Sequence, residues 1–265
     1  MTIHKDFVKN IIEIVKTDPT IAGLVVGGSW IENNIDEFSD LDLVLITDRL
    51  VSDDFNKMYG YAKRFGNLLN AFTGEHVGEK RLLICMYDNP LIHVDIKFIV
   101  KEDLKHRVED PIVLWDRDGS IMKIIETTTS EWSAINFQWI EDRFWTWIHY
   151  TATKLGRGEL FEALDCLSFL RIHVLSPLLQ ITCGQKPRGL RKIEQTCRKE
   201  DLLKLQETIS TYSVESIALS LGKAIEMYQE LRRELFKDNI VLRKDTEKRC
   251  VDYFYEIKER ILTDS

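Results

Sequence analysis

The sequence predicts an α/β N-terminal domain with a mixed sheet, followed by an all-α helical bundle. Three observations support this prediction. Strand-like and helix-like apolar patterns alternate through the first 125 residues, two strand candidates meet at a short turn, and only helical periodicity is found from residue 131 onward. Because 265 residues make about two ordinary domains, we expect the domains to span residues 1–125 and 126–265.

The first domain is expected to begin with a helix. Apolar residues recur at three- and four-residue intervals from Phe7 to Val15, and Asp18-Pro19 ends the pattern. A second helix is expected at 53–70, and strands at 22–27, 41–47, 81–87, 93–100 and 112–115. The turn Asp88-Asn89-Pro90 between two of these strands indicates a hairpin, as found in mixed sheets.

The second domain is expected to be helical throughout. Apolar positions keep helical spacing, and glycine-containing breaks fall at 156–158 and 184–189. Helices are expected at 131–156, 159–183, 200–212, 214–237 and 244–262. Packing their apolar faces together makes a bundle.

Composition favours a cytoplasmic protein without a membrane partner. The first residues carry neither a basic segment nor an apolar run, so no secretory signal is expected. No apolar run is expected to reach the roughly 18 residues that span a bilayer. The 5 cysteines form no C-x-x-C pair, which is typical of reduced thiols and not of zinc ligands.

Negative charge is concentrated near the N-terminus. The formal charge of the chain is −7, and residues 29–54 contain eight acidic residues against the single base Arg49. A nucleic-acid-binding surface usually has the opposite charge, so no nucleic acid partner is expected. A divalent cation or a cationic small substrate fits this charge, and a solvated acidic surface is the alternative.

Two acidic residues follow a glycine-rich turn at a definite distance. Gly27-Gly28-Ser29 ends one expected strand, and Asp40-Leu41-Asp42 begins the next. Because side chains alternate along a strand, Asp40 and Asp42 point to the same side. Two such carboxylates repel unless a cation lies between them, and Mg²⁺ prefers oxygen ligands. Glycine lets the backbone approach a ligand, and Ser29 offers donors for a phosphate oxygen.

Asp95 is the third candidate acid. It alternates with the apolar residues Val94 and Ile96 in its expected strand, so it projects from the opposite face. If that strand lies beside strand 41–47, three carboxylates meet at one surface. They could bind metal while one of them accepts a proton from an acceptor hydroxyl. His93, two residues earlier, shares this face, although a surface histidine is the simpler interpretation.

These motifs resemble the nucleotidyltransferase superfamily, and within it the antibiotic nucleotidyltransferases of the lincosamide and aminoglycoside kinds. Gly28-Ser29, about ten residues, then Asp40-Leu41-Asp42 on an apolar strand is similar to the superfamily signature. The segment 93–98 is similar to the strand that bears the third acid, and 113–119 to a strand ending in an Asp-x-x-Gly turn. The resemblance covers nearly the whole chain and implies a nucleotidyltransferase-type sheet.

The resemblance implies an Mg²⁺-dependent enzyme that moves a nucleoside monophosphate, AMP from ATP, onto a hydroxyl of a small molecule. Two Mg²⁺ ions would be held by Asp40, Asp42 and Asp95, with Asp95 also as the general base, and Gly28 and Ser29 would contact phosphate. The alternatives are a catalytically inactive nucleotide-binding regulatory protein and a nucleic-acid-directed nucleotidyltransferase.

The resemblance also implies that the helical domain covers the acceptor and forms a homodimer. The basic residue that many family members carry after Gly-Ser is replaced by Trp30-Ile31-Glu32. Helical bases could supply the missing charge, with ordinary solvated residues as the alternative: Lys154, Arg157, Lys186, Arg188 and Arg191. Glu141 could approach the site or face solvent. The tryptophans at 132, 139, 145 and 147 are interpreted as core and interface residues.

Overall fold

The computed structural model describes residues 2–263 and divides the chain between Ser133 and Ala134 into two compact units, a sheet unit and a helical unit. The division falls shortly after the expected boundary at residue 125. The reason is helix α3 (Ser120–Thr127), whose Ile121 is fully buried against the sheet. This helix, which the sequence analysis does not predict, therefore stays with the first unit.

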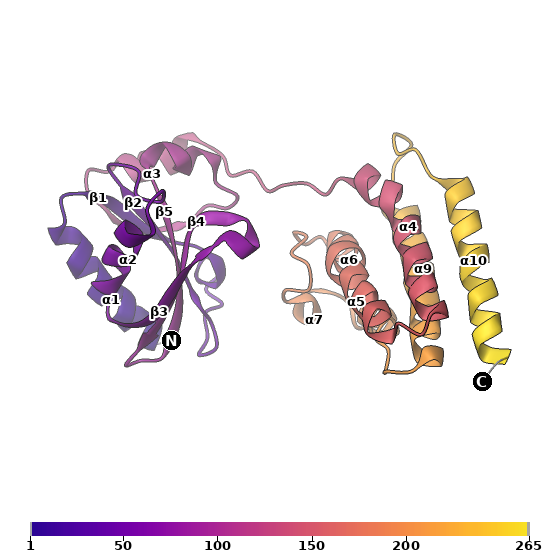
Figure 1. Ribbon diagram of the computed structural model, residues 1–265. Helices are drawn as coiled ribbons and strands as arrows, with labels where there is room; N and C mark the ends of the chain where they lie inside the picture. Colours follow the sequence, from indigo (N-terminus) through magenta and orange to yellow (C-terminus); the bar gives the residue numbers. More distant parts are fainter. Residues whose placement is uncertain (1, 264–265) are drawn as a thin grey trace. The chain divides into compact units, whose positions relative to one another are not determined.

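The sheet unit contains a mixed six-stranded sheet of order β3-β4-β5-β2-β1-β6 (Figure 1). Strands β2 and β5 are parallel and every other neighbouring pair is antiparallel, including the expected β4–β5 hairpin. The mixed sheet is thus confirmed. Its strands are β1 (Ile21–Val26), β2 (Leu41–Thr47), β3 (Asn67–Gly74), β4 (Glu79–Asp88), β5 (Ile92–Ile99) and β6 (Ile112–Asp116).

The two faces of the sheet are covered differently. Helices α1 (Thr2–Thr17) and α2 (Phe55–Lys63) pack on one face, where alternate residues of β2 such as Leu43 form the main core (Figure 1). The opposite face meets α3 and the 3-10 helix η3 (Lys101–His106) in a smaller apolar cluster. Residues that alternate with Leu43, including Asp42, project on this second face.

The prediction of a helix over residues 53–70 is wrong beyond Lys63. The chain turns at Gly66 and then forms β3, an edge strand paired only with β4 among the described strands. A Cβ at Gly66 would lie 3.3 Å from the rings of Phe7 and Tyr87, so the backbone approaches the core closely there. Phe65 and Leu69 fit a helical stripe, but β3 leaves Leu69 exposed. Sheet pairing therefore overrides the local pattern.

The helical unit confirms the expected bundle. Helix α10 packs along α4 and α9 (Figure 1), and Phe144, Trp145 and Tyr228 form the centre of the core. The helices are α4 (Phe137–Gly156), α5 (Leu160–Leu170), α6 (Ser176–Thr182), α7 (Ile193–Thr196), α8 (Lys199–Gln206), α9 (Val214–Leu235) and α10 (Lys244–Thr263), with a π-helical turn (Arg171–Leu175) between α5 and α6. Helix α4 begins later than residue 131 because Asn136 caps it by accepting a hydrogen bond from the Trp139 N–H at 2.9 Å.

One helical stretch departs from the expectation that no segment is long and apolar enough to span a membrane. Residues 160–182 meet that criterion by length and composition, with a mean hydropathy of 1.3 in the most apolar window. Half of that window is buried inside the helical unit. Core helices of bundles pass the same test, so the stretch is weak support for a membrane span.

Candidate active site

Three carboxylates meet on the second face of the sheet. Asp42 in β2 and Asp95 in β5 are direct partners in the parallel strand pair, and Asp40 comes just before β2. One oxygen of each lies within 4.8 Å of the others, and all three side chains are half-buried. The sequence-based expectation that these acids converge is confirmed. What they bind stays a prediction.

The glycine turn holds the Asp42 carboxylate closely. Gly28 has a φ of +60° and opens a short 3-10 turn, η1 (Gly28–Trp30), and a Cβ at this position would lie 1.8 Å from Asp42 Oδ2. The Gly27 N–H donates to the Asp42 carbonyl oxygen at 2.8 Å, which ties the turn to β2. Glycine is therefore needed at residue 28 for two reasons, its backbone conformation and the close approach of a site carboxylate.

Asp95 has a histidine beside it. His93 Nε2 lies 2.9 Å from Asp95 Oδ1, a distance that allows an ion pair, although the angles do not meet those of a hydrogen bond. The Asp95 side chain is 21% exposed and that of His93 is 41% exposed. Both side chains are therefore partly exposed, although the two atoms that face each other are buried.

An ion-pair cluster on the same sheet, in which Lys97 and Arg81 meet the carboxylates of Glu79 and Asp103, was missed by sequence reasoning, which sought the missing base in the helical half. Lys97 is two residues after Asp95 in β5 and therefore shares its face. Its Nζ lies 2.7 Å from Glu79 Oε2, and Arg81 Nη2 lies 2.8 Å from the same oxygen. The hydrogen bonds from Arg81 and Lys97 lower the pKa of Glu79 to about 2.

Glu109 is a fourth carboxylate at this site, and sequence reasoning also missed it. Its Oε1 accepts a hydrogen bond from the Gly28 N–H at 3.1 Å. The two residues are 81 positions apart, and Glu109 lies in an irregular segment before β6. No local pattern marks such a residue, so only the tertiary structure identifies it.

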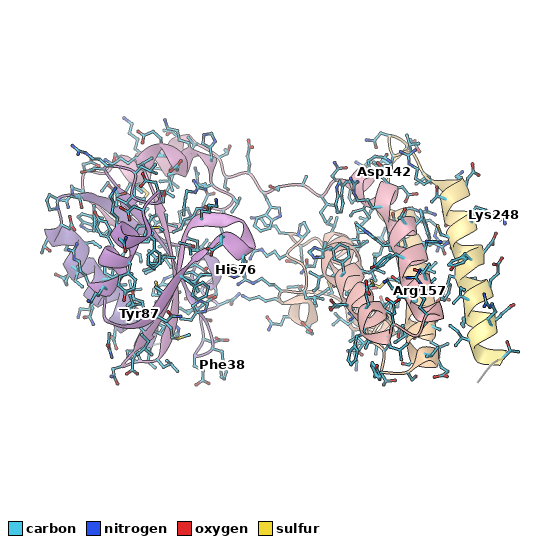
Figure 2. All side chains as sticks on the ribbon, in the orientation of Figure 1. Phe38, His76, Tyr87, Asp142, Arg157 and Lys248 are labelled. Atoms are coloured by element: carbon cyan, nitrogen blue, oxygen red, sulfur yellow. The ribbon has the colours of Figure 1, made fainter. Side chains whose placement is uncertain are left out.

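Two of the proposed helical bases, Lys154 and Arg157, pair with carboxylates of the helical unit. Lys154 Nζ lies 2.7 Å from Glu159 Oε2 and 3.0 Å from Glu162 Oε2, and the hydrogen bonds that it donates to these carboxylates raise the pKa of Lys154. Arg157, directly after α4 (Figure 2), lies 3.6 Å from Glu159 Oε1. The backbone N–H of Arg188 donates to Gln180 Oε1 at 2.7 Å. Contact of Lys154 and Arg188 with phosphate stays a prediction.

Glu141 does not face solvent, contrary to one of the two sequence-based interpretations. It is fully buried in the helical unit and accepts hydrogen bonds from Tyr228 Oη at 2.6 Å and from the Arg243 N–H at 2.8 Å. Arg232 Nη1 lies 3.2 Å away. Its carboxylate is a structural element of the bundle, because buried charges need partners of this kind.

An aromatic pocket of about 600 Å³ lies in the helical unit, lined by side chains of α4, α5 and the π-helical turn. The rings of Trp139 and Trp147 are 5.5 Å apart, and Phe169 lies 5.0 Å from Trp147. Asp142, seen on α4 in Figure 2, also lines it. Of the four tryptophans, Trp145 is buried core as expected, whereas Trp139 is 41% exposed at this pocket.

The chain matches one protein family and is similar to several solved structures. The family model described as streptomycin adenylyltransferase matches residues 1–257. Among solved structures, an aminoglycoside 6-adenyltransferase from Bacillus subtilis is 15% identical, with 94% of this chain and 97% of that chain covered and a TM-score of 0.40. A nucleotidyltransferase-like protein from Exiguobacterium sibiricum is 10% identical, with 96% and 88% covered and a TM-score of 0.36. No curated protein sequence matches the chain.

Proposed function

The chain belongs to the streptomycin adenylyltransferase family, and from this premise we propose that it moves AMP from ATP to a hydroxyl group of an aminoglycoside antibiotic. The family makes the chain an adenylyltransferase that uses a nucleotide and a small-molecule acceptor. The observation that supports our assignment of the site is the meeting of Asp40, Asp42 and Asp95 on one sheet face. A protein that only binds nucleotide has less need of the third acid.

The residues present fit divalent metal ions. Carboxylate oxygens are the ligands that Mg²⁺ prefers, and the repulsion among three carboxylates within 4.8 Å is relieved by a cation. Gly28 leaves open the space beside Asp42 Oδ2 that a Cβ would fill. We propose Asp40 and Asp42 as ligands of two Mg²⁺ ions, with Asp95 sharing one of them. Bound there, the metal would offset charge on the transferred phosphoryl group and on pyrophosphate.

Asp95 is our candidate for the general base. Register pairing fixes it beside Asp42, so its carboxylate is held next to the proposed metal ligands while staying partly exposed to an acceptor. It would accept the proton of the attacking hydroxyl, which frees the oxygen to bond to phosphorus. Ser29, next to Gly28 in η1, remains our candidate for a phosphate contact.

The helical unit is our candidate for acceptor binding. Its aromatic pocket has the volume of ordinary small-molecule sites, and a protonated amine is attracted to an indole face. The Arg143 guanidinium lies 4.4 Å from the Trp139 ring centroid, so this ring already contacts a cation, which a protonated amine of the acceptor would have to displace. Asp142 adds negative charge, since hydrogen bonds from Gln138 and Arg243 keep the pKa of Asp142 low.

The pocket proposal is tested with Trp139→Ala. We expect KM for the aminoglycoside to rise at least about tenfold while the affinity for Mg²⁺-ATP stays unchanged, because only the acceptor contacts the pocket. Phe161→Ala is the matched control, since Phe161 is an exposed aromatic residue of α5 that does not line the pocket. Equal KM values for both variants would contradict the proposal.

The function itself is tested by pyrophosphate release from ATP in the presence of aminoglycosides, lincosamides or RNA. We expect release to require Mg²⁺ and an aminoglycoside, and the antibiotic to gain the mass of one adenylyl group. Asp42→Asn serves as the inactive control. Release supported by RNA, or by a lincosamide alone, would refute the proposed acceptor class.

A further inference from the structure

Glu109 accepts the hydrogen bond of the backbone N–H of Gly28, a residue that the proposed function places against phosphate. The Gly28 N–H has a single hydrogen, and in this structure it is donated to Glu109 Oε1 at 3.1 Å. A Cβ at Gly27 would lie 3.2 Å from the same oxygen, so the carboxylate rests on the backbone of the glycine turn. The resemblance implies that Gly28 contacts phosphate, and its N–H is the hydrogen-bond donor with which it could do so. A carboxylate oxygen is a chemical stand-in for a phosphate oxygen, because both are anionic acceptors.

The backbone on both sides of Glu109 is anchored. The Arg107 side chain is only 6% exposed, and its Nη2 donates to the carbonyl oxygens of Ile125 at 2.9 Å and Thr128 at 2.6 Å. Asp110 pairs with Arg107 at 2.6 Å. The segment therefore holds its place, and rotation of the Glu109 side chain is the movement that frees the Gly28 N–H.

We propose that Glu109 holds the place of a phosphate oxygen at Gly28 in the nucleotide-free enzyme, and that the polyphosphate of the nucleotide displaces it on binding. The inference rests on the proposed ATP site. A carboxylate and a phosphate repel each other at hydrogen-bond distance and compete for one hydrogen, so they cannot share Gly28. The apparent affinity for nucleotide is therefore the intrinsic affinity multiplied by the fraction of molecules in which Glu109 has left the Gly28 N–H.

The test is calorimetric titration of the full chain with a non-hydrolysable ATP analogue and Mg²⁺. We expect Glu109→Ala to bind the analogue about 10- to 150-fold more tightly than wild type, the usual net worth of one hydrogen bond to a charged group. Glu109→Gln keeps an acceptor oxygen but loses the charge, so its affinity should fall between the two. AMP has a single phosphate, which does not extend to Gly28 in the proposed arrangement. The affinity for AMP should therefore be the same in Glu109→Ala and in wild type.

Glu126→Ala is the matched control, because it removes the same charge from an exposed position on α3. If Glu126→Ala gains the same affinity for the analogue, the effect comes from net charge, and the inference is overturned. Weaker analogue binding in Glu109→Ala with wild-type affinity in Glu109→Gln would also overturn it, since Glu109 would then support the glycine turn. Failure of every protein to bind the analogue would instead refute the proposed function.

Magnetic resonance of Gly28 and Glu109 in the wild-type protein tests the displacement without any variant. In wild-type protein, the Gly28 amide proton resonance should move on titration with the Mg²⁺-ATP analogue, together with the Glu109 side-chain carboxyl carbon. Movement of the amide with no change at the carboxyl carbon would show that Glu109 stays in place, which contradicts displacement.

Discussion

Gly28→Ala should separate the cost of backbone strain from the cost of moving Asp42, the carboxylate that we propose as a metal ligand. Gly28 has a φ of +60°, and an added Cβ would lie 1.8 Å from Asp42 Oδ2 and 2.8 Å from its Cγ. A left-handed backbone costs an alanine about 1–2 kcal/mol of folding free energy. The Asp42 carboxylate must also retreat by roughly 1 Å or more, a displacement that typically costs about 100-fold in rate.

Gly78→Ala is the matched control for this experiment. Gly78 has a φ of +79° in the same unit, and a Cβ there meets no atom within 4 Å. Both variants should lose free energy of unfolding from the left-handed backbone, and Gly28→Ala should lose more because its Cβ also displaces Asp42. Only Gly28→Ala should lose adenylyl transfer, measured as pyrophosphate release at saturating ATP and acceptor. If Gly28→Ala kept a rate within a few fold of Gly78→Ala, the assignment of Asp42 to the catalytic site would be refuted.

Three further predictions follow from the same site and from the bundle. Asp40→Asn and Asp42→Asn should each lose most turnover and keep or slightly gain thermal stability, because a repelling carboxylate is removed; near-normal turnover in either would refute the metal assignment. Asp95→Ala should bind Mg²⁺-ATP within a few fold of wild type, while single-turnover transfer falls by about 100- to 10,000-fold; loss of binding would make Asp95 a metal ligand first. Light scattering at micromolar concentration should report a homodimer, since the helical unit exposes Phe161; a mass near the 31.0 kDa of one chain would count against it.

Much of the site could be predicted because it depends on short-range geometry. The alternation of side chains along β2 requires Asp42 to face away from Leu43, and the bounds of this strand are as expected. A parallel neighbour at β5 then brings Asp95 alongside. Motif spacing, strand period and the resemblance to nucleotidyltransferases all pointed to the same residues.

Other features depended on contacts with distant segments, which the local sequence pattern does not reveal. The stretch after Lys63 had a helical stripe, yet the free edge of β4 offered hydrogen bonds that formed β3. Glu141 looked like a reserve catalytic acid, but Tyr228 and Arg232 hold it inside the bundle. In both cases the outcome was decided by partners from distant segments.

The sequence by itself determined the class of the fold, the three converging acids and the family resemblance, since period, spacing and residue chemistry are local properties. Only the tertiary structure decided that Glu109 holds the Gly28 N–H and that Lys97 and Arg81 bring positive charge to the sheet. Contacts between residues 81 positions apart are set by how the whole sheet packs. Such contacts leave no pattern in the chain.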